Sequence, residues 1–327
     1  MSAEAPTLGR YLARRVVQAV PLILGVLVLS FALIHLAPGD PIIVLAGDGG
    51  SEAYYTEMRA RYGLDRPLPE QLGRYLLAVA QGEFGYSFSH RQPVFQVILA
   101  RVPATLLLMG SALLFSIVVG VGLGVLSALR PRTPLDYGVS VLTLLGAAMP
   151  VFWLGQLMII LFAVQLQLFP VQGMVSVRER YTGLRYALDV LHHLVLPALT
   201  LGLLQLALLT RLTRTSLRES LAEDFVRTAR AKGLPERLVV LRHALRNALL
   251  PVVTVIGGQI GVLITGAALT ETIFAWPGLG RLLLEATLSR DYPLLMALFI
   301  VVAVSVVVAN LLTDVVYTIL DPRVRYS

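Results

Sequence analysis

The segment VPATLLLMGSALLFSIVVGVGLGVLSAL, residues 102–129, contains no Asp, Glu, Lys or Arg over 28 positions. A helix of about 20 apolar residues is long enough to cross the hydrocarbon core of a bilayer. This run therefore predicts a membrane-spanning helix. The composition agrees, because 56% of the 327 residues are hydrophobic and only 14% are charged, whereas soluble domains average about 25% charged residues.

Five further runs free of the same four residue types predict five further membrane helices. They occupy residues 16–39, 137–177, 190–210, 247–270 and 292–313. The longest has room for two helices, but its second part, QLQLFPVQGM at 165–174, contains three glutamines, a proline and a glycine. We therefore expect one helix near 137–164 followed by a loop. The prediction is an all-α polytopic membrane protein with six transmembrane helices, with five or seven as alternatives.

The distribution of Lys and Arg predicts that both termini are cytoplasmic. In that orientation the inner segments carry 16 of these residues and the outer segments carry 11, six of them in the long 37–102 segment. Positive residues collect in cytoplasmic loops, and long loops weigh little in this rule. The net charge of +7 has the same explanation, so we expect no nucleic-acid partner.

These boundaries define the expected organisation of the chain. The first run is long for a signal peptide and HLAPGD at 35–40 lacks an A-x-A-like cleavage site, so we interpret it as an uncleaved span. The expected parts are a cytoplasmic N-terminus 1–15, a first transmembrane helix 16–36, an extracytoplasmic region 37–101, a helical core 102–316 and a cytoplasmic tail 317–327. Within the core we expect helices near 103–129, 137–164, 191–211, 248–270 and 293–314, and a cytoplasmic hairpin at 213–246.

Several predicted spans contain glycines. Gly120, Gly122 and Gly124 fall in the second run and Gly202 falls in the fourth. Small residues let helices approach closely, which predicts tight packing. Interrupted helices also line passages in transporters, and the sequence leaves both readings open.

The block RTARAKGLPERLVVLRHALRNALLP, residues 227–251, carries six Lys and Arg residues against one Glu and contains Lys232, the only lysine of the chain. Gly233 suits the left-handed residue that ends a helix, and Pro235 suits the first turn of the next helix. Apolar residues at steps of three or four predict one apolar face on each helix. The two expected stripes are Leu217, Leu221, Phe225 and Ala229, then Leu238, Leu241, Leu245 and Leu249. Such a hairpin suits a surface helix on anionic lipid, a solvated connector or a docking element for another protein.

Several kinds of chemistry have no motif in the chain. No G-x-x-x-x-G-K-[ST] phosphate loop, H-E-x-x-H or G-x-S-x-G pattern occurs, and there are no cysteines. His192 and His193 are adjacent, so one helix does not aim both at one metal. Asp314, near the inner end of the sixth span, is interpreted as a structural anchor rather than a proton carrier. We therefore expect no catalytic residue and no metal or cofactor site, which makes an intramembrane enzyme the least favoured class.

Short motifs along nearly the whole chain carry a resemblance to a known family. In order they are YLARR, LAPGDP (36–41), GLDRPLPEQ (63–71), RVPATLLL (101–108), RTARAKGL (227–234), RHALRNALLPVVT (242–254), ETIFAWPGLG (271–280), RDYPLL (290–295) and LDPRVRY (320–326). With them the chain resembles the permease subunits of type I ABC importers, in the dipeptide, oligopeptide and nickel branch. Within that branch it is similar to the first of the two paired permeases.

The resemblance implies a function and a set of partners. It implies a permease of the prokaryotic cytoplasmic membrane that moves di- or oligopeptides, or a related small solute, inward by alternating access. The partners implied are a second homologous permease, two cytoplasmic ATPase subunits that bind ATP and Mg, and an extracytoplasmic solute-binding protein. A stand-alone channel or secondary transporter is the alternative, in which no ATPase takes part.

The resemblance also implies which residues dock the ATPases. The docking motif of the family has the pattern E-A-A-x-x-x-G, whose first three positions are Arg227, Thr228 and Ala229 here and whose glycine is Gly233. The first two positions depart from the pattern. The docking residues implied are Arg227, Thr228, Ala229, Arg230, Ala231, Lys232, Gly233 and Leu234.

Overall fold

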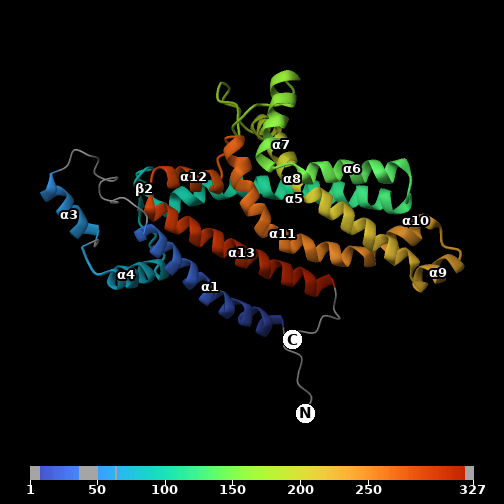
Figure 1. Ribbon diagram of the computed structural model, residues 1–327, viewed down its shortest axis with the longest axis horizontal. Helices are drawn as coiled ribbons and strands as arrows, with labels where there is room; N and C mark the ends of the chain where they lie inside the picture. Colours follow the sequence, from blue (N-terminus) through green and yellow to red (C-terminus); the bar gives the residue numbers. More distant parts are fainter. Residues whose placement is uncertain (1–7, 37–50, 63–64, 321–327) are drawn as a thin grey trace, which may run out of the picture. The chain divides into compact units, whose positions relative to one another are not determined.

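The computed structural model describes residues 8–36, 51–62 and 65–320, and helices make up most of this part of the chain (Figure 1). The α-helices are α1 (Leu8–Leu36), α3 (Glu52–Tyr62), α4 (Leu68–Ala80), α5 (Val94–Leu129), α6 (Pro134–Ala148), α7 (Val151–Met158), α8 (Leu184–Ala222), α9 (Asp224–Ala231), α10 (Glu236–Leu238), α11 (Leu245–Ile273), α12 (Leu279–Leu288) and α13 (Tyr292–Leu320). Two π-helical segments, η1 (Ile159–Gln165) and η2 (Val239–Ala244), continue α7 and α10. The strands β1 (Tyr86–Ser87) and β2 (Gln92–Pro93) pair antiparallel.

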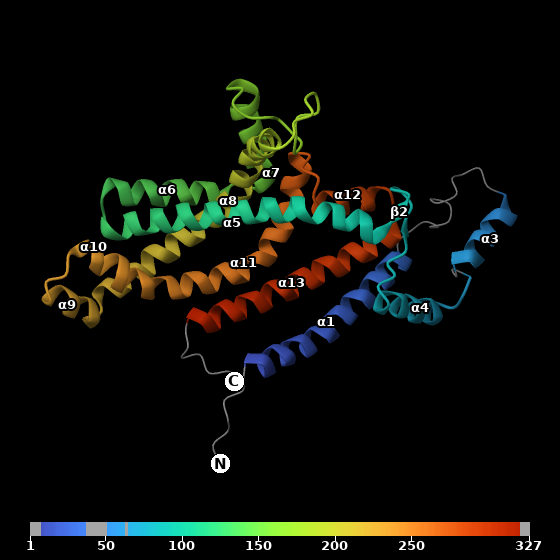
Figure 2. The ribbon, with the colours of Figure 1, turned by 180° about the vertical axis from the view of Figure 1, so that it is seen from behind.

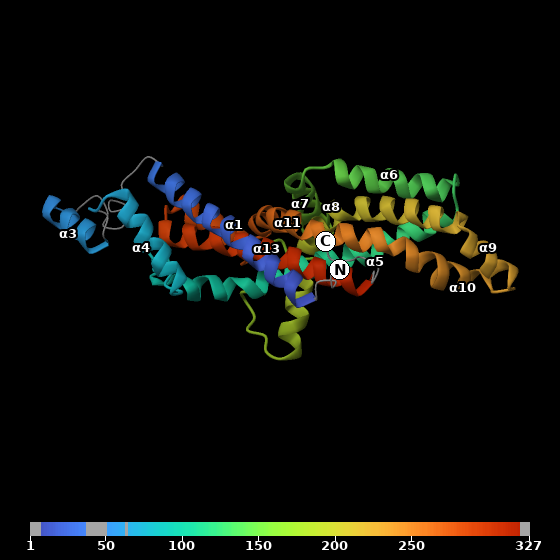
Figure 3. The same cartoon turned by 90° about the horizontal axis from the view of Figure 1, so that it is seen from below.

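The chain divides into two compact units, each with its own packing. Of the described residues, unit 1 comprises 8–36, 51–62, 65–103 and 281–308, and unit 2 comprises 104–280 and 309–320. In unit 2, α8 packs against α6, α7 and α11, and α6 runs back alongside α8 (Figure 3). Unit 2 therefore contains the expected cytoplasmic hairpin and most of the expected core.

Length and composition identify four helices in the described residues that are able to cross a membrane. These are α5, α8, residues 236–256 and residues 292–313, and a fifth is obtained if the bent pair of α6 with α7 and η1 counts as one span. In α1 the apolar part is shorter, Val17–Ala32. The structure thus has four or five long apolar helices, and the side chain of Asp314 lies outside the described residues.

The prediction of one continuous helix near residues 137–164 is wrong. α6 ends at Ala148, α7 begins at Val151, and the pair is bent by 107°. Met149 has ψ of 130° and Pro150 caps the next helix. A proline removes a backbone donor and disfavours helical geometry in the residue before it, so the apolar run continues while the helix does not.

The helix that contains the expected second span is longer than that span, because α5 begins at Val94 and contains Pro103. Val94, Val97 and Ile98 are buried, and the Val94 amide donates to the Gly85 carbonyl at 3.1 Å. Arg101 is the charged residue directly before the apolar run at 102–129. Packing of the turns that precede Arg101 extends the helix on its N-terminal side. The 37–101 segment therefore includes the first turns of α5 as well as α3 and α4.

A buried carboxylate organises part of unit 1. Asp291 accepts hydrogen bonds from the Ser87 hydroxyl at 2.6 Å, the Ser89 amide at 3.0 Å and the Ser89 hydroxyl at 2.8 Å. It also caps α13 by accepting from the Leu294 amide at 3.3 Å. The hairpin β1–β2 is thereby fastened to the start of α13.

Glycines bring α5 and α8 into close contact in unit 2. A Cβ atom on Gly124 would lie 2.6 Å from Cβ of Thr213, and one on Gly202 would lie 2.9 Å from the Ala112 carbonyl oxygen. The Ser116 hydroxyl donates to the Gly202 carbonyl at 2.7 Å. These contacts favour the tight-packing reading of Gly124 and Gly202, because a side chain at either position has no room.

We predict that Gly124→Val destabilises unit 2 while Gly122→Val does not. Valine at Gly124 collides with Thr213, and overpacking costs about 1–3 kcal/mol. Gly122 lies two residues away on the same helix, and a Cβ atom there would meet no other atom within 4 Å. Thermal unfolding of the two detergent-purified variants measures the difference, and equal midpoints would contradict the close contact.

Candidate functional site

The expected cytoplasmic hairpin is two helical arms joined by a short turn at one end of unit 2 (Figure 2). The first arm, α8, ends at Ala222, and Glu223 is extended with ψ of 152°. α9 then runs from Asp224 to Ala231. The second arm begins at α10, continues through η2 and merges into α11.

The turn at the tip is a Schellman motif built on Gly233. Gly233 has φ of +76°, its amide donates to the Arg230 carbonyl at 2.9 Å, and the Leu234 amide donates to the Ala229 carbonyl at 3.4 Å. Leu234 packs beside the cluster that contains Ala229, which is the apolar contact usual for this motif. Gly233 therefore ends α9 as the sequence predicts.

The buried face of the hairpin differs from the predicted stripes. Leu217 and Ala229 are buried, but Phe225 is 40% exposed and Val226 is fully buried instead. The extended residue Glu223 interrupts the helix and restarts its register, so steps of four counted across it fail. The first stripe is therefore wrong at Phe225.

The second stripe is wrong for the same kind of reason. Leu238 and Leu241 are exposed, whereas Val239, Val240 and Ala244 are buried. The π-helical turns of η2 add a residue per turn, which rotates later side chains relative to an α-helical count. The buried face packs in one cluster: Ala128, Leu217, Val226, Ala229, Val239, Ala244 and Ala248.

The opposite face of the tip carries most of the expected docking residues. Ala229 is buried and Leu234 is half-buried, and the remaining six are exposed: Arg227, Thr228, Arg230, Ala231, Lys232 and Gly233. The structure thus places six of the eight on one accessible turn and helix end. Whether they bind an ATPase stays a prediction.

Charge at the tip is arranged in two ion pairs. Arg230 makes a two-point contact with Glu236, at 2.6 Å and 3.1 Å, across the turn. These hydrogen bonds to Glu236 raise the pKa of the Arg230 guanidinium. Arg227 contacts Asp224 at 3.1 Å, with both side chains well exposed. Exposed pairs of this kind add little stability. Exchanging them for contacts with a partner therefore costs the folded chain little.

The structure adds a hollow next to the hairpin that the sequence did not predict as part of the site. A hollow of about 440 Å³ next to the hairpin is lined by Val125, Leu129, Glu236, Arg237, Val240 and Leu241. Phe225 and Leu238 on the hairpin are also exposed. The sequence signal for it was the apolar character of Leu238 and Leu241, which the stripe grouped with Leu245 on one helix face.

A second hollow lies near the start of α8. It measures about 430 Å³ and is lined by Glu179, Tyr181, Arg185, Leu188, Asp189 and His192. Asp189 accepts from the Ser176 amide and hydroxyl, each at 2.7 Å. The rings of His192 and His193 each hydrogen-bond a backbone carbonyl oxygen, that of Leu168 and that of Asp189, both at 2.8 Å. The bond of His192 to Leu168 holds the 166–183 segment on α8, whereas the bond of His193 to Asp189 lies within α8 itself.

Comparison with known proteins identifies relatives along almost the whole chain. Residues 120–326 match the family described as binding-protein-dependent transport system inner membrane component, and residues 8–109 match the N-terminal membrane component of such systems. The dipeptide transport system permease protein DppB of Escherichia coli K12 is 41% identical over 97% of this chain and 99% of its own length. The oligopeptide transport system permease protein AppB of Bacillus subtilis is 40% identical over 98% of this chain and its full length.

A solved structure supports the fold. A chain of the inward-facing MetNI methionine ABC transporter superposes with a TM-score of 0.57 at 18% identity. The match covers 70% of this chain and 98% of that one. The helical arrangement therefore has the fold of a type I importer permease.

We predict that Gly233→Ala loosens the tip of the hairpin and that Gly233→Asn does so less. A Cβ at Gly233 meets nothing within 4 Å, so the cost is conformational. A left-handed conformation costs an ordinary residue about 1–2 kcal/mol, and asparagine tolerates it better. Limited trypsin cleavage at Arg230 and Lys232 should accelerate roughly fivefold in the alanine variant, following the population of the opened turn. Equal cleavage of wild type and both variants would contradict this.

Proposed function

The chain belongs to the family of binding-protein-dependent transport system inner membrane components, and we propose that it is the permease subunit of an ATP-driven importer of dipeptides or oligopeptides. It is a multi-pass protein of the plasma membrane. The observation that carries the proposal is the full-length similarity to peptide permeases in distant bacteria. The chain is a transport subunit rather than a catalyst.

The membrane topology proposed has six spans with both termini in the cytoplasm. The four or five long apolar helices support most of these spans, and the apolar part of α1 supplies the first. The excess of Lys and Arg in the expected inner segments supports the orientation. In this topology the hairpin of α9 and α10 is cytoplasmic and the 166–183 segment faces outward.

The partners proposed follow from the family. They are a second homologous permease, two cytoplasmic ATPase subunits that bind ATP and Mg, and an extracytoplasmic solute-binding protein. In unit 2, α6 and α7 expose large apolar side chains, among them Leu142, Leu145 and Phe152. Within a membrane such surfaces face lipid or a neighbouring permease, which supports a protein that works in an assembly.

The docking role proposed for residues 227–234 rests on their accessibility and charge. The exposed Arg227 and Lys232 stand on a tip that Gly233 shapes and that a buried apolar face supports. A tip of this kind fits a groove on an ATPase better than it fits the bilayer, because its exposed face is polar. ATP binding would move the tip, and the spans would open alternately outward and inward.

The energetic requirement of this mechanism is differential affinity. A ligand shifts a two-state equilibrium only by binding one state more tightly than the other. ATP and the peptide-loaded binding protein would supply that bias from opposite sides of the membrane. The permease itself supplies the two arrangements of its helices.

Reconstitution tests the proposed function. In proteoliposomes, the chain together with its partner permease, both ATPases and the loaded binding protein should take up dipeptides only when ATP is present. The chain alone should give no uptake. Uptake by the chain alone would favour the alternative, a channel or secondary transporter.

A second experiment tests the docking surface. We predict that Arg227→Glu with Lys232→Glu releases the ATPases from the complex without lowering the amount of permease in the membrane. Both side chains are exposed, so the folded chain loses little. The matched control reverses the exposed Arg178 and Arg180 in the 166–183 segment. Normal co-purification and normal uptake with the first variant would refute the docking role.

A further inference from the structure

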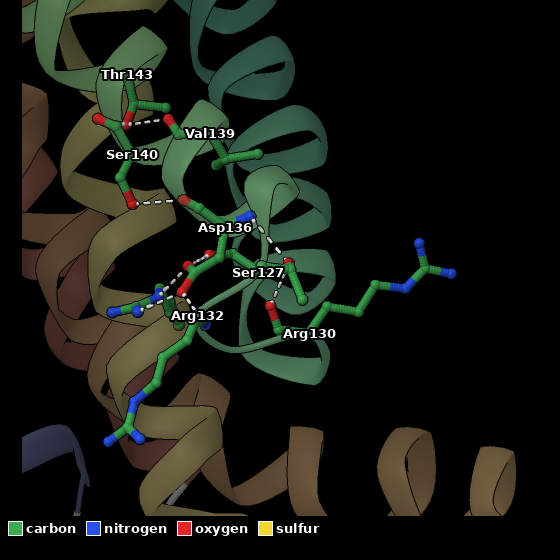
Figure 4. Close-up of polar contacts among 9 residues, drawn as sticks. Ser127, Arg130, Arg132, Asp136, Val139, Ser140 and Thr143 are labelled. Carbon is green, nitrogen blue, oxygen red and sulfur yellow. Dashed lines mark hydrogen bonds and ion pairs between the residues drawn. The ribbon is translucent and has the colours of Figure 1, made fainter.

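Three helices of unit 2 meet at one buried carboxylate near the hairpin, that of Asp136 (Figure 4). Asp136 on α6 is 2% exposed and Ser127 on α5 is fully buried. Arg214 on α8 is 78 positions away in sequence from Asp136. These three residues lie outside the proposed docking surface at 227–234.

The carboxylate is held from every side. Arg214 donates from Nε to Oδ1 at 2.7 Å and from Nη2 to Oδ2 at 2.8 Å. The Ser127 hydroxyl donates to Oδ1, and the Arg132 amide donates to Oδ2 at 3.0 Å. A two-point arginine contact fixes orientation as well as distance. The turn between α5 and α6 is therefore locked to α8 in one geometry.

The local sequence presents Asp136 for this contact. Thr133 caps α6 by accepting from the Asp136 amide, and its hydroxyl donates to the Arg130 carbonyl at 2.7 Å. Arg132 has φ of 60°, which turns the chain sharply. Figure 4 shows the Asp136 side chain directed toward Ser127, while the Arg130 side chain points away from both. The turn is thus shaped to aim one carboxylate at α8.

The arginine belongs to the stem of the hairpin. Arg214 lies on α8, which ends at Ala222 directly before α9. Its neighbour Thr213 fills the close contact at Gly124 of α5. Further along α8, the Ser220 hydroxyl donates to the Ala244 carbonyl at 2.9 Å and ties the stem to η2. Asp136 is therefore bonded to the first arm through Arg214, and the first arm is bonded to the second through Ser220 and Ala244.

We propose that Asp136 is a positioning residue for energy coupling, which makes the α5–α6 turn and the hairpin one rigid body. Motion imposed on residues 227–234 is then delivered to α5 and α6, instead of being absorbed by bending of α8. This inference rests on the proposed function, because it assigns a path to the force that the ATPases apply. A buried ion pair is weak evidence for stability but suits a contact that must hold one geometry.

A distance measurement tests the rigid body directly. The chain has no cysteine, so Arg130→Cys and Arg242→Cys place spin labels at two exposed positions, one on the turn and one on η2. In the assembled complex the label-to-label distance should be the same in nucleotide-free and ATP-trapped states. Adding Asp136→Asn should make it differ between those states. A distance that changes with nucleotide in the parent chain, or that Asp136→Asn leaves constant, overturns the proposal.

A transport measurement separates coupling from folding. Asp136→Asn should lower uptake per ATP hydrolysed roughly fivefold or more, the usual scale of a lost coupling energy. The control Arg130→Gln removes a positive charge from the same turn and leaves the side chains of Ser127, Asp136 and Arg214 in place. Asp136→Asn with Arg214→Met removes both charges, which restores assembly if the single variant fails through an orphaned charge. In that double variant uptake per ATP should remain low.

The outcomes distinguish this inference from the proposed function. If the parent complex shows no ATP-dependent uptake, the proposed function fails. If the parent complex works and the Asp136 variants assemble poorly yet keep normal uptake per ATP, Asp136 is only structural and the inference fails. Low uptake per ATP in assembled complexes supports it.

Discussion

The hydrocarbon core of a bilayer offers the peptide backbone no hydrogen-bonding partner, and this constraint underlies the rest of the structure. Helices satisfy their own backbone groups, so the long apolar runs become helices. The bend between α6 and α7 has a local cause, because Pro150 cannot continue the helix that ends at Ala148. With backbone bonds satisfied within each helix, contacts between helices must come from close packing and from a few buried polar groups.

Unit 2 uses both kinds of contact along α8. Gly124 and Gly202 remove the side chains that would keep α5 and α8 apart. Beyond this contact, the Asp136–Arg214 pair and the Ser220–Ala244 bond link α8 to the turn on one side and to η2 on the other. A helix fixed in this way transmits displacement along its length, which is what a coupling stem requires.

The candidate site could be predicted in part from the sequence. The glycine cap at Gly233 and the two-arm hairpin followed from local chemistry, and the structure confirms both. The buried faces did not follow, because Glu223 and the π-helical turns of η2 each shift the helical register. Periodicity assumes one uninterrupted helix, so Phe225, Leu238 and Leu241 were assigned to the wrong side.

The apolar helices, the structural class and the family all follow from the amino-acid sequence, because length, composition and ordered motifs are local properties of the chain. Which face of the hairpin is buried, and where Asp136 finds its partner, depend on how the helices pack. No spacing rule joins Asp136 to Arg214, since the pair forms only when α6 and α8 come together. A contact of that kind depends on three-dimensional packing, for which a single sequence carries no local signal.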